Sequence, residues 1–174
     1  MSKNYKQILP QINSLLLDVD GVLTDGHVYF ESDGKARRQL YTKDSFAIQF
    51  AIRQGLRVGI ITGGSGAGLH DVFRELGVVD LYVNASDKLD AFNDFTAIYD
   101  LQPENIAYMG DDLPDYGVMQ RVGLSTCPAD ASPYIRERVH YVSPHKGGKG
   151  AVRDIIEQWL RVKDLFDKPE KWTW

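Results

Sequence analysis

The sequence predicts an α/β fold built on a mostly parallel sheet with helices on both faces. Short apolar runs that suit buried strands alternate along the chain with segments whose apolar residues recur at helical spacing. With 174 residues, of which 43% are hydrophobic, the chain can bury one core without disulfides or a structural metal. We therefore expect a single domain over residues 1–174.

The first predicted strand ends in acidic residues. Ser14 to Asp18 reads SLLLD, a short apolar run typical of a buried parallel strand that presents side chains at its carboxyl end. Asp18 and Asp20 should therefore lie at a strand tip. Two strand-like runs follow within residues 26–41, and the Asp33-Gly34 pair between them favours a tight reversal. This segment is expected to form a protruding hairpin.

Helices and strands then alternate through the middle of the chain. The expected order is a helix at 44–54, a strand at 57–62, a helix at 69–76, a strand at 81–83, a helix at 86–99 and a strand at 106–109. Gly55 and Gly77 close the first two of these helices. Ser86 suits the cap of the third helix, which carries Lys88 in its first turn.

The remaining elements lead to a charged tail. We expect a helix at 114–121, strands at 124–126 and 140–142, and a last helix at 149–162. Sheets of this kind bind ligands beyond the carboxyl ends of their parallel strands, so the polar residues that follow each strand form one candidate site. The tail, residues 163–174, ends in Trp172-Thr173-Trp174, and we expect these rings to pack against a protein surface.

Composition narrows the possible classes of function. A net charge of −4 opposes a general electrostatic grip on nucleic acid, which needs a clustered basic face. Cys127 is the only cysteine, which leaves no intrachain disulfide, and the four histidines show no metal-ligand spacing. Because no secretory or membrane-spanning run is apparent, we expect a cytoplasmic protein with neither nucleic-acid nor membrane partners.

One motif and three further pieces carry chemistry. Residues 18–26 read DVDGVLTDG and resemble the first signature of the haloacid dehalogenase superfamily phosphatases, DxDGxLTDG. Thr62 after a strand, Lys88 before a helix and Gly-Asp-Asp-Leu-Pro-Asp at 110–115 follow in that superfamily's order. The resemblance implies a Rossmann-like fold of this superfamily and a magnesium-dependent phosphomonoester hydrolase that works through an aspartyl phosphate.

The chemistry of phosphate esters explains these residue types. A phosphate monoester dianion repels an attacking anion, so positive charge must first gather around the phosphoryl group. The carboxylates of Asp18 and Asp111, with the backbone carbonyl of Asp20, are hard oxygen ligands suited to Mg²⁺. The sequence therefore predicts a magnesium site at the strand tips.

Each polar residue then has a candidate role. Asp18 is the expected nucleophile, and Asp20 is the expected general acid and base. The side chains of Thr62 and Lys88 are also expected to be catalytic. Phosphate binding is assigned to Asp18, Asp20, Thr62, Gly63 and Lys88, and Asp112 and Asp115 are expected to orient metal-bound waters and Lys88.

Within the superfamily, the chain resembles the phosphatases that act on 3-deoxy-D-manno-octulosonate 8-phosphate and on nonulosonate 9-phosphates. The resemblance covers about residues 15–160 and includes the early hairpin, Asp87-Lys88-Leu89 and the Lys-Gly-Gly-Lys-Gly run at 146–150. It implies a capless homotetramer for lipopolysaccharide sugar biosynthesis. In such an assembly, the hairpin, and sometimes the tail with Trp172 and Trp174, covers a neighbour's active site.

Two departures from the family pattern leave the substrate open. Gly64 stands where the family usually has arginine, and Lys43-Asp44-Ser45 stands where Arg-Asp-Gly is usual. The candidates for a cation that binds the sugar acid's carboxylate are Lys43, Lys146, Lys149, Arg37 and Arg38. A nonulosonate 9-phosphate, of the KDN or sialic acid type, is the alternative substrate.

Two non-enzymatic interpretations compete with a phosphatase. A signalling receiver domain also places acidic residues, threonine and lysine around a phosphorylated aspartate, but its lysine comes last, whereas here Asp112 follows Lys88. A catalytically silent scaffold is the other interpretation, and the presence of every polar group needed for hydrolysis argues against it.

Overall fold

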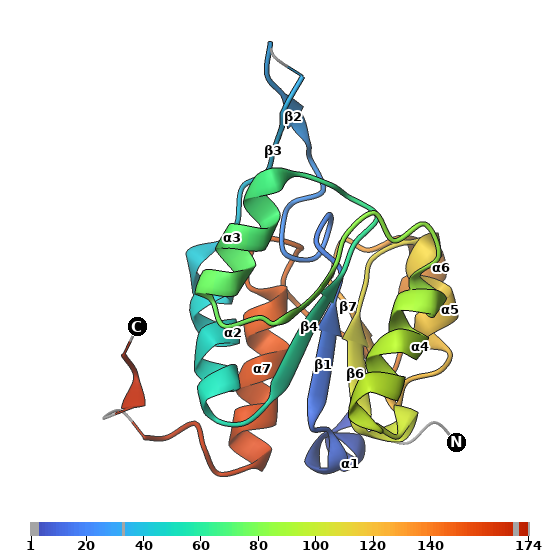
Figure 1. Ribbon diagram of the computed structural model, residues 1–174. Coiled ribbons are helices and arrows are strands. Elements are labelled where there is room, and N and C mark those ends of the chain that lie inside the picture. Colours follow the sequence, from blue (N-terminus) through green and yellow to red (C-terminus); the bar gives the residue numbers. More distant parts are fainter. Residues whose placement is uncertain (1–3, 33, 169–170, 174) are drawn as a thin grey trace.

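A six-stranded sheet forms the centre of the computed structural model, which describes residues 4–32, 34–168 and 171–173. Asp33 of the expected hairpin turn and Trp174 of the tail lie outside the described residues. The strands are β1 (Ser14–Leu17), β4 (Arg57–Ile61), β5 (Asp80–Tyr82), β6 (Ile106–Met109), β7 (Leu124–Cys127) and β8 (Tyr141–Val142). Their order is β5-β4-β1-β6-β7-β8, and every neighbouring pair is parallel (Figure 1).

The register brings the strand tips to one edge of the sheet. Leu17, the last residue of β1, lies opposite Ile60 of β4 and Met109 of β6. All four residues of β1 and of β6 are buried, as the continuous apolar runs predicted for central parallel strands. The residues that follow β1, β4 and β6 are therefore level with one another at the carboxyl edge.

Helices cover both faces of the sheet (Figure 1). On one face lie α2 (Thr42–Arg53), α3 (Ala67–Glu75) and α7 (Ala151–Val162), and on the other lie α4 (Lys88–Tyr99), α5 (Tyr116–Met119) and α6 (Pro133–Arg136). Side chains alternate along a strand, so Leu15 and Leu17 enter the first core while Leu16 enters the second. Short turns complete the described structure: α1 (Tyr5–Ile8) and 3-10 turns at Leu9–Gln11, Pro103–Asn105 and Leu113–Asp115.

Several helices differ from the sequence predictions. The helix expected at 114–121 is a 3-10 turn followed by the single turn of α5. Asp87 rather than Ser86 caps α4, because its side chain accepts the N–H of Leu89 at 2.8 Å. The helices α1 and α6 were not predicted, since four residues are too few for a helical period.

The hairpin is present and projects beyond the carboxyl edge of the sheet (Figure 1). Its strands, β2 (Tyr29–Phe30) and β3 (Ala36–Arg37), pair antiparallel but are only two residues long, shorter than the strand-like runs in the sequence. Tyr29 is 59% exposed and Phe30 is 76% exposed. The described chain thus leaves both aromatic rings largely uncovered.

The loop before α7 supports the loop that follows β1. Asp44 at the start of α2 is buried and accepts the N–H groups of Gly150 at 3.1 Å and Arg153 at 2.7 Å, which caps α7. A Cβ on Gly147 would lie 1.9 Å from the carbonyl oxygen of Gly21, so no side chain fits there. This contact explains the glycine at position 147 as a packing requirement.

The described part of the tail packs on its own chain. The indole N–H of Trp172 donates to the carbonyl of Phe166 at 3.0 Å, and the two rings lie 5.7 Å apart. Phe46 and Phe50 of α2 line the same small cavity as these two rings. Among the described helices, none combines the length and the apolar character needed to cross a bilayer.

Candidate active site

The predicted site residues gather at the carboxyl edge of the sheet. Asp18 follows β1, Thr62 follows β4 and Asp111 follows β6 by two residues, while Lys88 is the first residue of α4. Asp18, Thr62 and Lys88 are buried. The register of the three central strands accounts for this convergence, because it sets their tips side by side.

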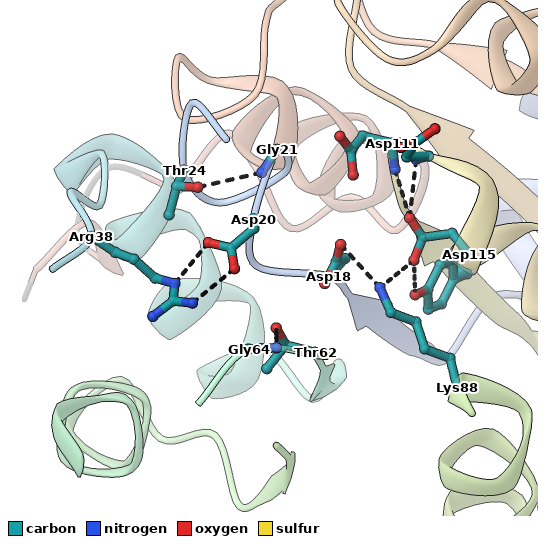
Figure 2. Close-up of polar contacts among 12 residues, drawn as sticks. Asp18, Asp20, Gly21, Thr24, Arg38, Thr62, Gly64, Lys88, Asp111 and Asp115 are labelled. Atoms are coloured by element: carbon teal, nitrogen blue, oxygen red, sulfur yellow. Dashed lines mark hydrogen bonds and ion pairs between the residues drawn. The ribbon is translucent and has the colours of Figure 1, made fainter. Parts of the chain in front are cut away.

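A buried lysine joins two buried carboxylates (Figure 2). The Lys88 ammonium lies 3.0 Å from an oxygen of Asp18 and 2.7 Å from an oxygen of Asp115. The three side chains are only 7%, 8% and 1% exposed, respectively. Burial opposes the charge of Lys88, yet the two carboxylates raise its pKa above the ordinary value, so the ammonium is held protonated.

Asp115 is the hub of this cluster. Besides Lys88, its carboxylate accepts the hydroxyl of Tyr108 at 2.6 Å and the backbone N–H groups of Asp111 at 2.9 Å and Asp112 at 3.2 Å. A Cβ on Gly110 would lie 2.3 Å from the carboxyl carbon of Asp115. Asp115 thus contacts both Lys88 and the loop that carries Asp111.

The carboxylates of Asp18, Asp111 and Asp115 offer oxygen atoms that all lie within 4.8 Å of one another. Burial, and then the charge of Asp115, raise the pKa of Asp18 to about 7, and the same two causes raise the pKa of Asp111 to about 7. Such crowding of negative charge is costly unless a cation offsets it. The donor set therefore fits a hard divalent cation, which prefers carboxylate oxygens.

Glycine is required where the loop after β1 meets Asp111. Gly21 has a φ of 87°, and a Cβ there would lie 2.1 Å from an oxygen of Asp111. The hydroxyl of Thr24 accepts the N–H groups of Gly21 at 3.3 Å and Gly26 at 3.2 Å, which holds the loop in shape. The DVDGVLTDG motif thus packs its backbone directly against the second acidic strand tip.

Asp20 has a different partner from Asp18. Its carboxylate forms a two-point ion pair with Arg38, at 2.7 Å from Nε and 2.9 Å from Nη2 (Figure 2). Arg38 comes from the chain just after the hairpin strand β3. Figure 2 shows Asp20 pointing away from the Lys88 side of the cluster and toward Arg38.

Thr62, Gly63 and Gly64 form the turn that follows β4. The Thr62 hydroxyl accepts the N–H of Gly64 at 3.0 Å, and its side chain is buried, whereas Gly63 is exposed. Asp112 is exposed, and it forms a capping box with Asp115, whose carboxylate accepts its backbone N–H. Of the two residues expected to orient metal-bound waters and Lys88, Asp115 is the one that contacts Lys88 among the described interactions.

Of the five cations considered for the substrate's carboxylate, Arg38 lies in contact with a candidate catalytic residue. Arg37 is 72% exposed and pairs with Glu31 at 2.7 Å. Lys43 lies over the ring of Tyr41, and Lys146 and Lys149 are exposed on the loop before α7. Tyr108, in contrast, had no sequence pattern to mark it, since it is one residue of a buried apolar strand.

Comparisons with known proteins agree with this geometry. The family model described as haloacid dehalogenase-like hydrolase matches residues 77–156. The chain is 41% identical over 157 residues to the 3-deoxy-D-manno-octulosonate 8-phosphate phosphatase of Salmonella typhi, covering 90% of this chain and 84% of that protein. The chain thus belongs to the haloacid dehalogenase-like hydrolases.

Solved structures show which members of that family this chain resembles. The 3-deoxy-D-manno-octulosonate 8-phosphate phosphatase of Yersinia pestis superposes with a TM-score of 0.92 at 39% identity, over 95% of this chain and 89% of that one. The enzyme of the same name from Moraxella catarrhalis, in complex with magnesium ion, phosphate ion and KDO, gives a TM-score of 0.90 at 31% identity, with 93% of each chain covered. This membership sets aside the receiver-domain interpretation.

Proposed function

We propose that the protein is a magnesium-dependent phosphatase that hydrolyses 3-deoxy-D-manno-octulosonate 8-phosphate through an aspartyl phosphate on Asp18. The observation that carries this proposal is the buried cluster in which Lys88 joins Asp18 to Asp115 beside Asp111. The names of the related enzymes support the choice of substrate. In this proposal, the nucleophile, the phosphate-binding cation and the metal ligands all lie at the carboxyl edge of the sheet.

The carboxylates of Asp18 and Asp111 and the backbone carbonyl of Asp20 are the proposed magnesium ligands. When bound, Mg²⁺ offsets the charge of these carboxylates and of the phosphoryl oxygens. Asp115 lies in the same cluster, but its two oxygens already accept hydrogen bonds from Lys88, Tyr108 and two backbone N–H groups. We therefore assign to Asp115 the positioning of Lys88 and of the Asp111 loop.

The proposed reaction has two displacements at phosphorus. A carboxylate oxygen of Asp18 attacks the phosphorus atom, the bond to the sugar oxygen breaks, and Asp20 gives that oxygen a proton. Asp20 then takes a proton from water, which attacks the phosphorus and releases inorganic phosphate from Asp18. Lys88, the Thr62 hydroxyl and the Gly63 N–H hold the phosphoryl oxygens in both steps.

A panel of substrates tests the proposed function. Phosphate release should be measured with 3-deoxy-D-manno-octulosonate 8-phosphate, a nonulosonate 9-phosphate, glucose 6-phosphate and a nucleoside monophosphate. The eight-carbon sugar acid is expected to give the highest kcat/KM. A preference for the nonulosonate would move the assignment to the alternative substrate, and a preference for hexose phosphates or nucleotides would contradict the sugar-acid assignment.

Removing the metal is expected to abolish activity. After treatment with EDTA and desalting, phosphate release should fall to the background, because Asp18, Asp111 and the substrate phosphate then repel one another. Adding Mg²⁺ should restore the full rate, whereas adding Na⁺ at equal ionic strength should not. Full activity of the metal-free protein would contradict the proposed magnesium site.

We also propose that the chain acts as one domain, residues 1–174, in a cytoplasmic homotetramer. The hairpin at 26–41 supports this proposal, because Tyr29 and Phe30 are exposed on an element that projects from the sheet edge. In such an assembly, the hairpin, and possibly the tail at 163–174, would cover a neighbour's site. Light scattering should then report four times the chain mass, and an active monomer would contradict this model.

A further inference from the structure

Hydrogen bonds hold the Arg38 side chain beside Asp20, the proposed general acid and base. The Nε and Nη2 atoms of Arg38 donate to the two oxygens of Asp20 (Figure 2). Its Nη1 atom donates to the carbonyl of Ser65 at 3.1 Å. The Arg38 side chain is only 9% exposed, whereas that of the preceding Arg37 is 72% exposed. Two adjacent arginines thus differ in exposure, and the less exposed one contacts the proposed acid and base, Asp20.

The glycine at position 64 makes room for this guanidinium. A Cβ on Gly64 would lie 2.6 Å from Nη2 of Arg38, closer than side chains approach one another. The backbone of Gly64 is outside the left-handed region, so a larger residue there would not strain the backbone but would have to displace the guanidinium of Arg38. The position of the Arg38 guanidinium therefore depends on the glycine that stands at position 64, where the family usually has arginine.

The Arg38 guanidinium has donors left over, and Arg38 lines a cavity. Arginine has five N–H groups, and contacts with described residues occupy three of those of Arg38. A cavity of about 570 Å³ lies between the hairpin and α3. Its walls include Phe30, Leu40, Leu69, Val72, Lys35 and Arg38, and no carboxylate is among the described residues that line it.

A buried cation, Lys88, and a half-buried cation, Arg38, flank the reacting carboxylates. Lys88 lies on the Asp18 side and Arg38 lies on the Asp20 side, at opposite ends of the cluster in Figure 2. A ligand with one anionic group would need only the first of these positions. A ligand with a phosphate and a second anionic group matches both, and a guanidinium binds a carboxylate through two parallel hydrogen bonds.

We propose that Arg38 is the residue that selects a carboxylate-bearing substrate. Its free N–H groups bind the carboxylate of the sugar-acid phosphate in the cavity between the hairpin and α3, while its opposite edge keeps Asp20 in position. This inference rests on the proposed function, because it assigns a contact to the substrate named there. It makes the hairpin a part of the chain's own binding site.

The test compares Arg38→Ala with Arg37→Ala on two substrates. The first is 3-deoxy-D-manno-octulosonate 8-phosphate, and the second is ribose 5-phosphate, a primary sugar phosphate without a carboxylate. Loss of a hydrogen bond between charged groups corresponds to about a 10- to 150-fold change. The ratio of the two kcat/KM values should therefore fall by about that factor in Arg38→Ala, whereas Arg37→Ala should leave the ratio unchanged.

The outcomes separate this inference from the proposed function. If Arg38→Ala lowers kcat/KM for both substrates in the same proportion, Arg38 only positions Asp20 and the inference is wrong. If the wild-type protein shows no preference for the sugar acid, the proposed function fails and the inference fails with it. Calorimetric titration with the dephosphorylated sugar acid gives a second readout, since Arg38→Ala should weaken its binding and Arg37→Ala should not.

A double-mutant cycle checks the coupling to Gly64. Gly64→Ala should displace the guanidinium and lower the same substrate ratio, because the added Cβ takes the place of Nη2. In the Arg38→Ala background, the further effect of Gly64→Ala on the ratio should be small. A Cβ at position 64 would also approach Asp20 at 3.1 Å and Thr62 at 3.2 Å. Additive losses would show that Gly64 acts through one of these residues, and would contradict the coupling between Gly64 and Arg38.

Discussion

Replacing Asp18 with Asn is expected to lower the rate of phosphate release by at least about 10⁴-fold, because an amide is a poor nucleophile and a weaker metal ligand. The substitution keeps the shape of the side chain, so substrate and Lys88 should stay in place. Single-turnover measurements with the purified variant and excess Mg²⁺ would give the residual rate. Phosphate release near the wild-type rate would rule out Asp18 as the nucleophile.

The same variant should be at least as stable as the wild type when no metal is bound. Burial and the charge of Asp115 raise the pKa of Asp18, so at pH 8 its ionised form opposes folding, and an uncharged amide removes this cost. In EDTA, the melting temperature of Asp18→Asn should therefore equal or exceed that of the wild type. With Mg²⁺ the order should reverse, since the wild type gains more from the cation.

An exposed aspartate serves as the matched control. Asp71 lies on the exposed side of α3, so Asp71→Asn should leave both the rate and the melting temperature close to the wild type. An Asp18→Asn protein that melts well below the wild type in EDTA would show that the carboxylate is needed for folding. In that case the loss of activity would carry no information on the nucleophile.

The strand tips could be predicted from the sequence because parallel strands leave a local pattern. Asp18 and Thr62 each follow a continuous apolar run, and both were expected at the edge where they lie. Lys88 was placed in the first turn of a helix, although Asp87 and not Ser86 caps that helix. Such positions depend on short segments and on the rule that ligands bind at the carboxyl edge.

The partners of these residues could not be predicted in the same way. Tyr108 donates to Asp115 from inside a buried strand, and nothing in a run of apolar residues marks one ring as a hydrogen-bond donor. Arg38 reaches Asp20 across eighteen positions of the chain, through a loop and a hairpin whose path the sequence does not specify. The departure at Gly64 was visible in the sequence, but its spatial reason required the position of Arg38.

Replacing Asp115 with Asn is expected to have the largest effect on stability. The Asp115 carboxylate is 1% exposed and accepts hydrogen bonds from four groups, among them the Lys88 ammonium and the Tyr108 hydroxyl. An amide of the same size turns an N–H₂ group toward some of these donors, and each buried donor left without an acceptor costs about 1–3 kcal/mol. Because at least two donors lose an acceptor, the free energy of unfolding in EDTA should fall by about 2–6 kcal/mol.

A second carboxylate on a helix surface provides the comparison for that variant. Glu157 pairs with Arg153 at 2.5 Å, but both side chains are partly exposed, so Glu157→Gln should cost no more than about 1 kcal/mol in urea unfolding. Activity should fall with Asp115→Asn even at temperatures where the variant is folded, because Lys88 and the Asp111 loop lose their anchor. The error of such a measurement is about 1 kcal/mol. If the free energies of unfolding of Asp115→Asn and Glu157→Gln differ by no more than this error, the buried cluster does not hold the strand tips together.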